Sequence, residues 1–469
     1  MLYNELGQEI ERILPGNVIS QWQYDVTGRP TSHRISSQNR HTRRRVYNWD
    51  VNHRLKSMVN ELTAGQTTYG YDEFSNLVWS NEGNPFDFLH RNVDDVGNLY
   101  ETKEKTDRVY GAGSRLLETK DAKFSYDEEG NLVQKVEKNG DTWQYEYTGN
   151  GMMSKVIKPD QTEVTFKYDS LGRRIEKSSN EKTTRFVWDG NTILHEYFLE
   201  NDPVEPQNKL EIPDNVVTWV FNDGFVPSAK ITGEGNYSII SDYLGTPVEA
   251  YDEEGKKVWS AELDIYGRVK EFTGEKDFIP FRYQGQYEDI EIGLYYNRFR
   301  YYDPEQGNYT QIDPIGLAGG NPTLYGYVGN PNKHVDTFGL YNGEGVRELG
   351  IYDVFHSHLL KSSEFTNTDT YHFSKANESL HKAFQNDPAF KAAMEAQYPG
   401  VSKHVASTRM GTYRGTAPKG ITWHHATSSQ VDGQKGWLQL VDQKYHKIYH
   451  PDDIGGRNEW GGGTSCRKK

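Results

Sequence analysis

Four histidines near the C-terminus carry the strongest chemical signal in the sequence. His424 and His425 are adjacent, and after a gap of about twenty residues His446 and His450 follow at i,i+4 spacing. Residues at that spacing lie on one face of a helix, so the last two rings can converge on one metal ion. Neutral imidazole is a common ligand of transition metals and a natural general base near neutral pH. The pattern predicts a metal-dependent phosphodiesterase centre; the alternative is a closed structural zinc site, which would be unusual without cysteine.

The residues around these histidines have the pattern of two strands followed by a helix. Residues 421–425 and 436–441 are predicted as paired strands, and Asp442 as the start of a helix that carries the last two histidines. Another helical segment is predicted at residues 374–397, with its first residue as the N-cap and a break at 386–388.

Composition indicates that this C-terminal segment is attached to a larger, β-rich part of the chain. The 469 residues exceed what one hydrophobic core fills, so two or more units are expected. The 32 tyrosines and 45 glycines favour a β-rich structure with many turns over a helical bundle. The one cysteine, Cys466, excludes an intramolecular disulfide framework. No apolar run approaches the roughly 20 residues of a membrane span, and the first residues, which form neither a basic nor an apolar run, do not predict a signal peptide.

Charge is distributed unevenly between the two parts. Residues 341–469 contain 16 Lys and Arg against 13 Asp and Glu, whereas residues 1–340 contain 37 against 54. Within residues 403–469 the balance is 11 against 5. A small basic unit that also holds nine of the 15 histidines predicts a polyanion-binding domain on an acidic carrier. The alternative is a chance asymmetry without functional meaning.

A short motif recurs through the first part of the chain. Its clearest copies begin with Tyr-Asp at residues 24, 71, 126 and 168, and weaker copies begin at 47, 93, 147 and 187. Each copy predicts a strand that ends in an aromatic residue, a turn built from Asp and Gly or Asn, and a second strand. One such hairpin is marginally stable alone, so the copies are expected to stack into a long coiling sheet.

These copies resemble the YD repeats of the Rhs and YD-repeat proteins. A longer block is similar to the Rhs repeat-associated core, with the runs GLYYNRFRYYDP (293–304), QIDPIGL (311–317) and YGYVGNP (325–331). The resemblance implies a mostly β fold, with a YD-repeat spiral or shell in residues 1–280 and the core in residues 281–340. The shell would enclose or present a C-terminal toxin domain in residues 341–469. Because the repeats are few, an open partial spiral or a truncated family member is expected.

The same resemblance implies self-cleavage. Two DPxGL motifs end the core in this family, and the Asp of each takes part in the cut. Asp313 begins a full match, whereas Asp336 begins a match in which Thr337 replaces the proline. The implied cut falls after Leu340, and its chemistry requires two carboxylates close enough to share a proton. The alternative is that both carboxylates only cap turns beside glycines.

The C-terminal pattern resembles the ββα-metal fold of HNH nucleases, and more narrowly the WHH and colicin-type DNase and tRNase toxin domains. The shared features are WHH at 423–425, LQLV at 438–441, the two later histidines and the glycine-rich segment 455–463. The resemblance implies a small α+β domain in which His424, His446 and His450 hold one divalent metal ion (Zn, Mg, Mn or Ni). His425 would be the general base, although the roles of His424 and His425 can also be exchanged.

Other residues are candidates for supporting roles in this domain. The chain lacks the central Asn of the HNH pattern; Gln439 stands near that place and could hold the loop, or it could be an outward-facing strand residue. Four basic residues are candidate phosphate contacts, with a solvated basic face as the alternative for each: Lys435, Lys444, Lys447 and Arg457.

Together these features predict a polymorphic toxin effector that cuts nucleic acid, with DNA the favoured substrate. The prediction includes a cognate immunity protein, acidic because it must cover a basic cleft. It also includes delivery machinery, with the protein secreted or delivered into target cells by a specialised secretion system. The closest alternative is an RNase that attacks tRNA or rRNA with the same site. A second alternative is a YD-repeat structural or surface protein with an inactive tail.

Overall fold

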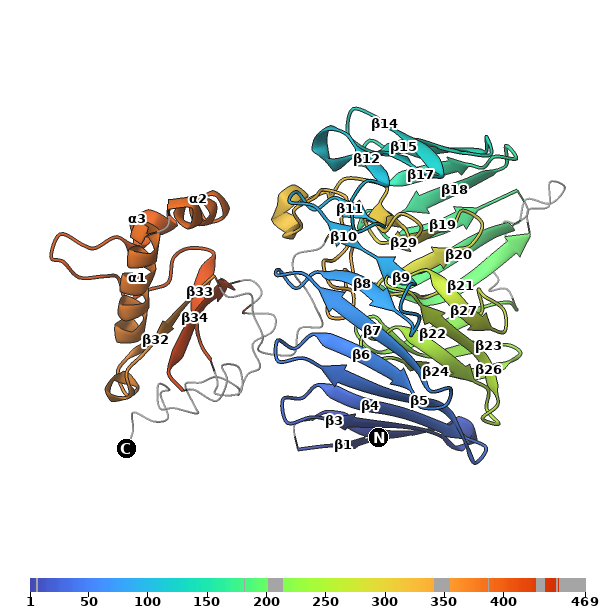
Figure 1. Ribbon diagram of the computed structural model, residues 1–469, viewed down its shortest axis with the longest axis horizontal. Helices are drawn as coiled ribbons and strands as arrows, with labels where there is room; N and C mark the ends of the chain where they lie inside the picture. The colour runs from blue at the N-terminus through green and yellow to red at the C-terminus, as the bar shows by residue number, and fades with distance from the viewer. Residues whose placement is uncertain are drawn as a thin grey trace. The chain divides into compact units, whose positions relative to one another are not determined.

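The computed structural model describes residues 1–5, 7–180, 182–200, 214–340, 355–386, 388–426, 435–443 and 446. They belong to two compact units, residues 1–346 and 347–469, which we call the shell unit and the C-terminal unit (Figure 1). The boundary between the units falls in a stretch outside the described residues. Among the described helices, none is long and apolar enough to cross a membrane.

The shell unit begins with a nine-stranded antiparallel sheet in which each strand pairs with its neighbours in sequence. Its strands are β1 (Leu2–Tyr3), β2 (Glu9–Leu14), β3 (Val18–Tyr24), β4 (Pro30–Ser37), β5 (Arg40–Trp49), β6 (Leu55–Asn60), β7 (Gly65–Tyr71), β8 (Leu77–Asn81) and β9 (Phe88–His90). A short pair, β10 (Asn92–Val93) and β11 (Leu99–Tyr100), follows it.

A second antiparallel sheet contains sixteen strands, again paired in chain order. They are β12 (Arg108–Tyr110), β13 (Leu116–Thr119), β14 (Ala122–Tyr126), β15 (Leu132–Glu137), β16 (Thr142–Tyr147), β17 (Met153–Ile157), β18 (Glu163–Tyr168), β19 (Arg174–Ser178), β20 (Lys182–Asp189), β21 (Thr192–Glu200), β22 (Val217–Asp223), β23 (Val226–Thr232), β24 (Gly235–Ser241), β25 (Pro247–Tyr251), β26 (Lys257–Leu263) and β27 (Val269–Thr273). In Figure 1 the first sheet (blue) climbs one side of the shell unit and the second (cyan to yellow-green) descends on the other.

The start of the first sheet packs against the far part of the second. Val18 and Ile35 share a buried cluster with side chains of β24 and β25, namely Ile240, Val248 and Tyr251. The backbones also approach closely, because a Cβ atom on Gly16 would lie 2.0 Å from the backbone nitrogen of Gly255. The two sheets therefore form one wound wall, and the expectation of stacked hairpins in a long coiling sheet is confirmed.

The repeated Asp residues explain where the hairpins of the YD motif turn. In the first copy, Asp25 Oδ1 accepts the backbone N–H groups of Thr27 and Arg29, at 2.9 and 3.0 Å. Gly28 has a φ of +84°, which glycine adopts without strain. Equivalent carboxylates accept turn N–H groups throughout the shell unit, at Asp50, Asp72, Asp94, Asp127, Asp169, Asp242, Asp252 and Asp264.

The tyrosine before the Asp ties each strand to the preceding one. The hydroxyl of Tyr24 on β3 donates to the carbonyl oxygen of Glu9 on β2, at 2.9 Å. Tyr71, Tyr147 and Tyr168 make the same bond to the strand before their own, with distances of 2.7, 2.8 and 2.7 Å. A tyrosine at this place both buries an aromatic ring and satisfies a backbone carbonyl.

The predicted core block forms a small sheet joined to both large ones. Its strands are β28 (Tyr287–Asp289), β29 (Leu294–Asn297), β30 (Arg300–Asp303) and β31 (Asn308–Tyr309), and a 3₁₀ turn, η3, spans Gly316–Gly319. The backbone N–H of Leu77 donates to the carbonyl oxygen of Gly329, and that of Leu132 to Thr310, both at 2.9 Å. These bonds fix the core against the strands that follow two of the YD turns.

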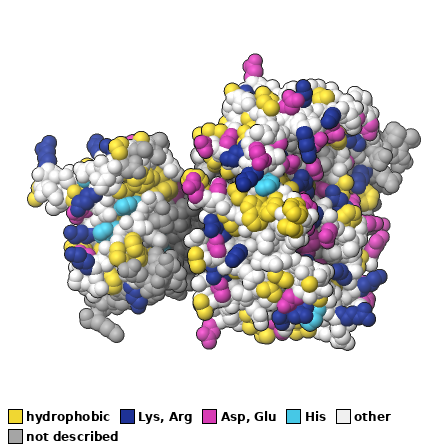
Figure 2. Space-filling view, in the orientation of Figure 1, with side chains coloured by type: hydrophobic (Ala, Val, Ile, Leu, Met, Phe, Trp, Pro, Cys, Tyr) yellow, Lys and Arg dark blue, Asp and Glu magenta, His cyan; other side chains and the backbone are white. Residues whose placement is uncertain are grey.

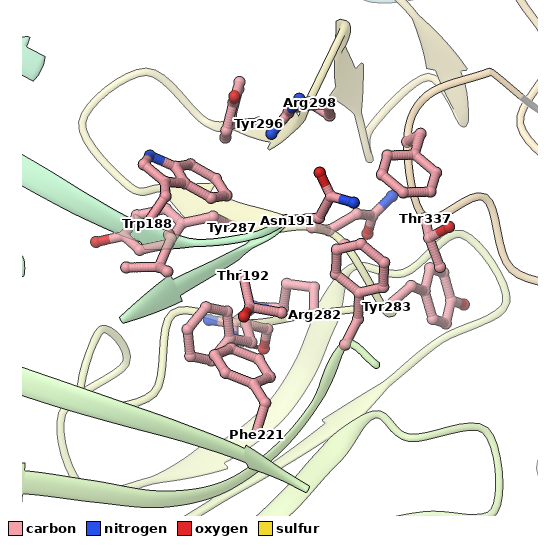
Figure 3. Close-up of a pocket in the computed structure, with 16 residues that line it drawn as sticks. Trp188, Asn191, Thr192, Phe221, Arg282, Tyr283, Tyr287, Tyr296, Arg298 and Thr337 are labelled. Carbon is pink, nitrogen blue, oxygen red and sulfur yellow. Dashed lines mark hydrogen bonds between the residues drawn. The ribbon is translucent and has the colours of Figure 1, made fainter. Parts of the chain in front are cut away.

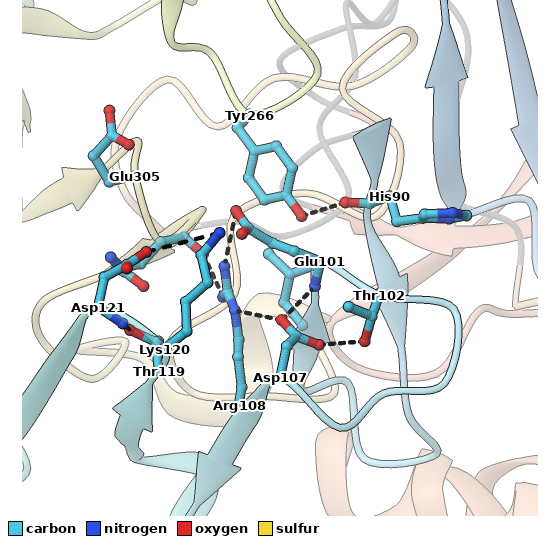
Figure 4. A network of polar contacts seen from close by, with 12 residues as sticks. His90, Glu101, Thr102, Asp107, Arg108, Thr119, Lys120, Asp121, Tyr266 and Glu305 are labelled. Atoms are coloured by element: carbon cyan, nitrogen blue, oxygen red, sulfur yellow. Dashed lines mark hydrogen bonds and ion pairs between the residues drawn. The ribbon is translucent and has the colours of Figure 1, made fainter. Parts of the chain in front are cut away.

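A polar network fastens the connection between the two large sheets (Figure 4). Arg108, at the start of β12, is buried and donates from Nη1 to the carbonyl oxygen of Gln306 at 2.7 Å. Its guanidinium also lies 3.4 Å from the carboxylate of Glu101 and 3.7 Å from that of Asp107. Asp107 in turn accepts the backbone N–H of Glu101 at 2.9 Å. Residues 101–107, between the β10–β11 pair and β12, are therefore held in place by ion pairs and hydrogen bonds to charged groups.

The C-terminal unit is a three-stranded antiparallel sheet with helices. The strand order is β32 (His356–Leu359), β34 (Trp437–Asp442), β33 (Ile421–His425). The helices are α1 (Asp369–Asn386), α2 (Pro388–Gln397) and α3 (Val401–Val405), preceded by a 3₁₀ turn, η4 (Ser362–Glu364). Trp423 on β33 donates its indole N–H to Asn377 on α1 at 2.9 Å, which joins the sheet to the longest helix.

One local prediction for this unit needs correction, and one strand was not predicted. Ser374 is not an N-cap, because α1 begins five residues earlier at Asp369 and the Ser374 hydroxyl donates to the carbonyl oxygen of Tyr413. The strand β32 was not predicted, since its sequence, HSHL, has no apolar alternation. The break before Pro388 and the pairing of β33 with β34 are confirmed.

A buried charge pair gives a stability prediction for the shell unit. Arg174 on β19 has no exposed surface; it pairs with Asp289, and its guanidinium lies 4.4 Å from the ring centre of Tyr296. Replacing Arg174 by Ala leaves the buried carboxylate of Asp289 without its main partner. The free energy of unfolding should therefore fall by about 3–5 kcal/mol. The measurement is the urea midpoint followed by far-UV circular dichroism.

The matched control is Arg185→Ala on the next strand. Arg185 pairs with Glu176 at 2.9 Å, but its side chain is 45% exposed, so the expected loss is below about 1 kcal/mol. Equal losses for the two variants would contradict the proposed difference between the pairs.

Candidate functional site

The histidine pair ends β33, and its two rings lie on opposite faces of the sheet. Successive side chains of a strand alternate between faces. His425 meets His372, a residue of α1, whereas His424 meets His446, which follows β34. Both histidines of the pair are buried, with 1% of His424 and 6% of His425 exposed. The sequence therefore builds two separate groups of polar atoms around the end of one strand.

On the first face the structure brings together three of the predicted site residues. His424 Nδ1 lies 3.2 Å from His446 Nε2. Gln439 is directly opposite His424 in the register of β33 and β34, so its side chain is on the same face. Lys435 is exposed just before β34. The remaining predicted residues lie outside the described residues: His450, Lys444, Lys447 and Arg457.

The geometry of this face fits the expected metal. Two imidazole nitrogens bound tetrahedrally to one zinc ion at about 2.0–2.1 Å lie about 3.3 Å apart. The 3.2 Å between His424 Nδ1 and His446 Nε2 is compatible with that arrangement.

On the second face, His425 joins two residues that sequence reasoning did not assign. His425 Nε2 lies 3.0 Å from His372 Nδ1 and 3.8 Å from Asp369 Oδ1. The three side chains supply one atom each within 4.8 Å of one another, a set that can also hold a cation. Asp369 and His372 are at i,i+3 in the first turn of α1. The i,i+3 spacing of an acid and a histidine could have indicated this group from the sequence. It was missed because the helix was predicted to begin at residue 374.

The two aspartates of the implied self-cleavage meet at one arginine. Arg300 Nη2 lies 3.0 Å from Asp313 Oδ2 and 3.4 Å from Asp336 Oδ2, and all three side chains are buried. Burial raises the pKa of Asp313 above its usual value, and the charge of Arg300 opposes that rise. Asp313 also accepts the backbone N–H of Ile315 at 2.9 Å, so it caps a turn as well as facing Arg300. The structure thus brings the two carboxylates together across 23 residues of sequence.

The residues next to the implied cut are held by the same group. Asp336 Oδ1 accepts the backbone N–H of Leu340 at 2.9 Å, and its Oδ2 accepts the hydroxyl of Tyr309 at 2.8 Å. Arg300 donates from Nε to the carbonyl oxygen of Gly339 at 2.6 Å. Arg300 and Tyr309 lie in or beside the core motif, but only the folded chain shows that they contact the aspartates.

A largely aromatic pocket borders the segment between Asp336 and Leu340 (Figure 3). Its walls include Trp188, Phe221, Tyr283, Tyr287, Arg298 and Thr337. Gly285 also lines it, and a Cβ atom there would lie 2.2 Å from the carbonyl oxygen of Thr337. The backbone at Thr337 therefore packs directly against Gly285, which limits its movement on that side.

Comparison with known proteins identifies the shell unit. The family model of the Teneurin YD-shell matches residues 6–318. The chain belongs to the Teneurin YD-shell family. The mostly β YD-repeat fold expected from the repeats is thereby confirmed.

Curated relatives include toxins and nucleases. Double-stranded DNA deaminase toxin A of Burkholderia cenocepacia is 32% identical over 321 residues, 63% of this chain and 22% of that protein. Probable deoxyribonuclease RhsB of Dickeya dadantii is 29% identical over 359 residues, 72% of this chain and 24% of that protein. The tRNA nuclease WapA of Bacillus subtilis is 27% identical over 236 residues, 48% of this chain and 9% of that protein. The chain thus spans about a quarter or less of the length of these relatives.

Among solved structures, the Photorhabdus luminescens Tc holotoxin pore is similar in fold. The match has a TM-score of 0.51 at 17% identity, and it covers 73% of this chain and 19% of that chain. The TcdB2-TccC3-TEV crystal structure matches with a TM-score of 0.50 at 18% identity, covering 72% of this chain and 19% of that chain. At these identities the likeness concerns the fold alone.

The glycine beside Thr337 gives a prediction with a built-in control. Gly285 and Gly293 both have positive φ, +85° and +69°, so alanine at either costs about 1–2 kcal/mol of backbone strain. Only Gly285 faces a backbone atom, whereas a Cβ on Gly293 meets nothing within 4 Å. Gly285→Ala should therefore lose about 1–3 kcal/mol more than Gly293→Ala in urea unfolding. Similar losses would show that Thr337 is not held by this contact.

Proposed function

We propose that the C-terminal unit is a metal-dependent endonuclease of the HNH class and the toxic payload of a polymorphic toxin. The observation that carries the proposal is the approach of His424 to His446, with Gln439 on the same face, at the end of a β-hairpin. Strand, strand and helical residues follow one another in the order of a ββα-metal fold: β33, β34, then Gln443 and His446 in helical conformation. The relatives named deoxyribonuclease, DNA deaminase toxin and tRNA nuclease add support from their names.

The residues of the unit divide the chemistry between the two faces of β33. His424, His446 and His450 would hold one divalent ion, which neutralises the phosphate and stabilises the leaving oxygen when bound. His425 would take a proton from the water that attacks phosphorus in line. Because both histidines end the same strand, a phosphodiester at the strand end has the metal ligands on one side and the base on the other.

Charge favours a polyanionic substrate. Among the described residues of the C-terminal unit, nine Lys and Arg stand against five Asp and Glu. Figure 2 shows dark blue side chains spread over the visible face of this unit, whereas acidic and basic side chains are mixed on the shell unit. Lys435, Lys444, Lys447 and Arg457 are the proposed phosphate contacts. DNA is the favoured substrate, and tRNA or rRNA is the second candidate because one relative is named a tRNA nuclease.

The biological setting follows from the same proposal. A nuclease of this kind harms the cell that makes it, so a cognate immunity protein with an acidic surface would cover the basic face. The payload would reach target cells through specialised delivery machinery, as suits a chain whose relatives include Toxin protein Tse5 of Pseudomonas aeruginosa.

We also infer that the chain cuts itself after Leu340. Water adds to the carbonyl carbon of Leu340, and the C–N bond to Tyr341 breaks. Asp336 takes the proton of the water, and Asp313, whose raised pKa favours the protonated acid, supplies a proton to the leaving amine. The shared contact with Arg300 and the bond from Leu340 to Asp336 support these roles.

The nuclease proposal predicts divalent-metal-dependent nicking of supercoiled plasmid by the purified chain. His424→Ala and His446→Ala should lose both bound metal and cutting, because each removes a ligand. His425→Ala should keep the metal and lose about 10²–10⁴-fold in rate, as expected for a lost general base. Agarose gels and metal analysis by mass spectrometry give the two readouts.

The control variant is His381→Ala, whose ring lies on α1 beside Tyr413 and should change neither readout. Total RNA incubated in parallel decides between DNase and RNase. Full cutting by His425→Ala, or no cutting of either substrate by the wild type, would reject the proposal.

The self-cleavage proposal predicts a fragment that begins at Tyr341 when the purified chain is run on a denaturing gel. Asp313→Asn and Asp336→Asn keep the size of the side chain but remove its acid–base chemistry, so each should leave the chain intact. Asp121→Asn is the control, since that side chain is 72% exposed and pairs with Lys120 rather than with Arg300. N-terminal sequencing that finds another cut site, or a cut in both core variants, would contradict the inference.

A further inference from the structure

A chain of three polar groups on the α1 side of β33 defines the protonation pattern of His425. His372 Nε2 lies 2.9 Å from the carbonyl oxygen of Glu364, and His372 Nδ1 lies 3.0 Å from His425 Nε2. A carbonyl oxygen only accepts hydrogen bonds, so His372 must carry its proton on Nε2. In the neutral ring Nδ1 is then an acceptor, and His425 must donate to it from Nε2. In a neutral His425 ring, the other nitrogen, Nδ1, then carries no proton.

The carboxylate of Asp369 favours the same tautomer of His425. Its Oδ1 lies 3.8 Å from His425 Nε2, which is beyond hydrogen-bond length but close enough for electrostatic attraction. A negative charge beside Nε2 favours the tautomer with the proton on that atom. Two residues of the first helical turn therefore agree on which nitrogen of His425 is protonated.

The helix that carries these residues is locked to the strand that carries His425. Trp423 donates to Asn377 Oδ1 at 2.9 Å, and Asn377 donates to the carbonyl oxygens of Arg414 and Thr416, both at 2.8 Å. His372 itself has no exposed surface. The imidazole of His372 thus has little freedom to turn away, so its bond to His425 is a fixed part of the fold.

We propose that His372 is a positioning residue, which holds His425 in the tautomer whose Nδ1 accepts the proton of the attacking water. The inference rests on the proposed nuclease function and deepens it, because it names the reacting atom of the base and the residue that selects it. Asp369 supports the same tautomer, and the Glu364 carbonyl sets the orientation of His372. The two faces of β33 then have different roles. His424 on one face would bind the ion, and His372 on the other face would orient His425, the base.

The first test is spectroscopic and does not depend on activity. The full chain is labelled with ¹⁵N-histidine, and the ring signals of His425 are assigned by comparison with His425→Ala. The proposal expects an unprotonated Nδ1 and a protonated Nε2 in the wild type, and a mixture of tautomers in His372→Ala. A wild-type His425 with its proton on Nδ1 would overturn the proposal even if the protein is a nuclease.

The second test uses the kinetics of plasmid nicking by the metal-loaded full chain. His372→Ala should lower kcat about 10–100-fold with little change in KM, the usual effect of removing the partner that orients a site histidine. His372→Asn places an amide oxygen where Nδ1 stood, so it should recover part of the loss. The matched control on the same helix is His381→Ala, which should retain the wild-type kcat.

The outcomes separate this inference from its alternatives. An unchanged kcat in His372→Ala would remove the positioning role. Loss of one equivalent of bound metal in His372→Ala, with His424→Ala still retaining one, would show instead that Asp369, His372 and His425 are ligands of a cation. Absence of nuclease activity in the wild type would end the proposed function, while the ring signals would still report the tautomer.

Discussion

The shell unit depends on one repeated interaction, the carboxylate that accepts backbone N–H groups inside each YD turn. Without it, the backbone N–H groups inside these turns would lose their side-chain acceptor, and a backbone donor left without a partner costs free energy comparable to a lost hydrogen bond. The strand register shifts at the tyrosine before this carboxylate in copy after copy, at Tyr24, Tyr71, Tyr126 and Tyr168. Such bulges increase the right-handed twist of a strand pair. The same turn chemistry that ends a strand therefore also makes the sheet coil.

Buried carboxylates of the core are compensated in two different ways. Asp289, on β28 of the core, pairs with both Arg174 and Lys177 of the wall strand β19, so two cations compensate its charge. At the implied cleavage site, one guanidinium, that of Arg300, serves two buried carboxylates. Burial raises the pKa of Asp313, and the neighbouring charge of Asp336 acts in the same direction. The carboxylate of Asp289 thus has two cations beside it, whereas the two carboxylates near the implied cut share one.

The features that were visible in the sequence are those set by neighbouring residues. The turns, the order of the strands and the hairpin that carries His424 and His425 follow from short patterns, and the structure has them. Contacts made by folding were not visible. Arg300 meets its aspartates across 13 and 36 residues, and His372 reaches His425 across 53. The sequence of β32 has no alternation of apolar residues, and the strand is formed by its pairing with β34.

Because each strand of the two large sheets pairs with its neighbours in the chain, the wall can assemble in the order in which it is translated. Each new strand can pair with the strand that precedes it in the chain. Few long loops therefore need to close before stabilising contacts form. The tyrosine-rich core emerges afterwards and bonds to strands such as β8 and β15 that are already in place. The basic C-terminal residues leave the ribosome only then. A growing chain of this design would complete its shell unit before the C-terminal unit, the proposed nuclease, has been synthesised.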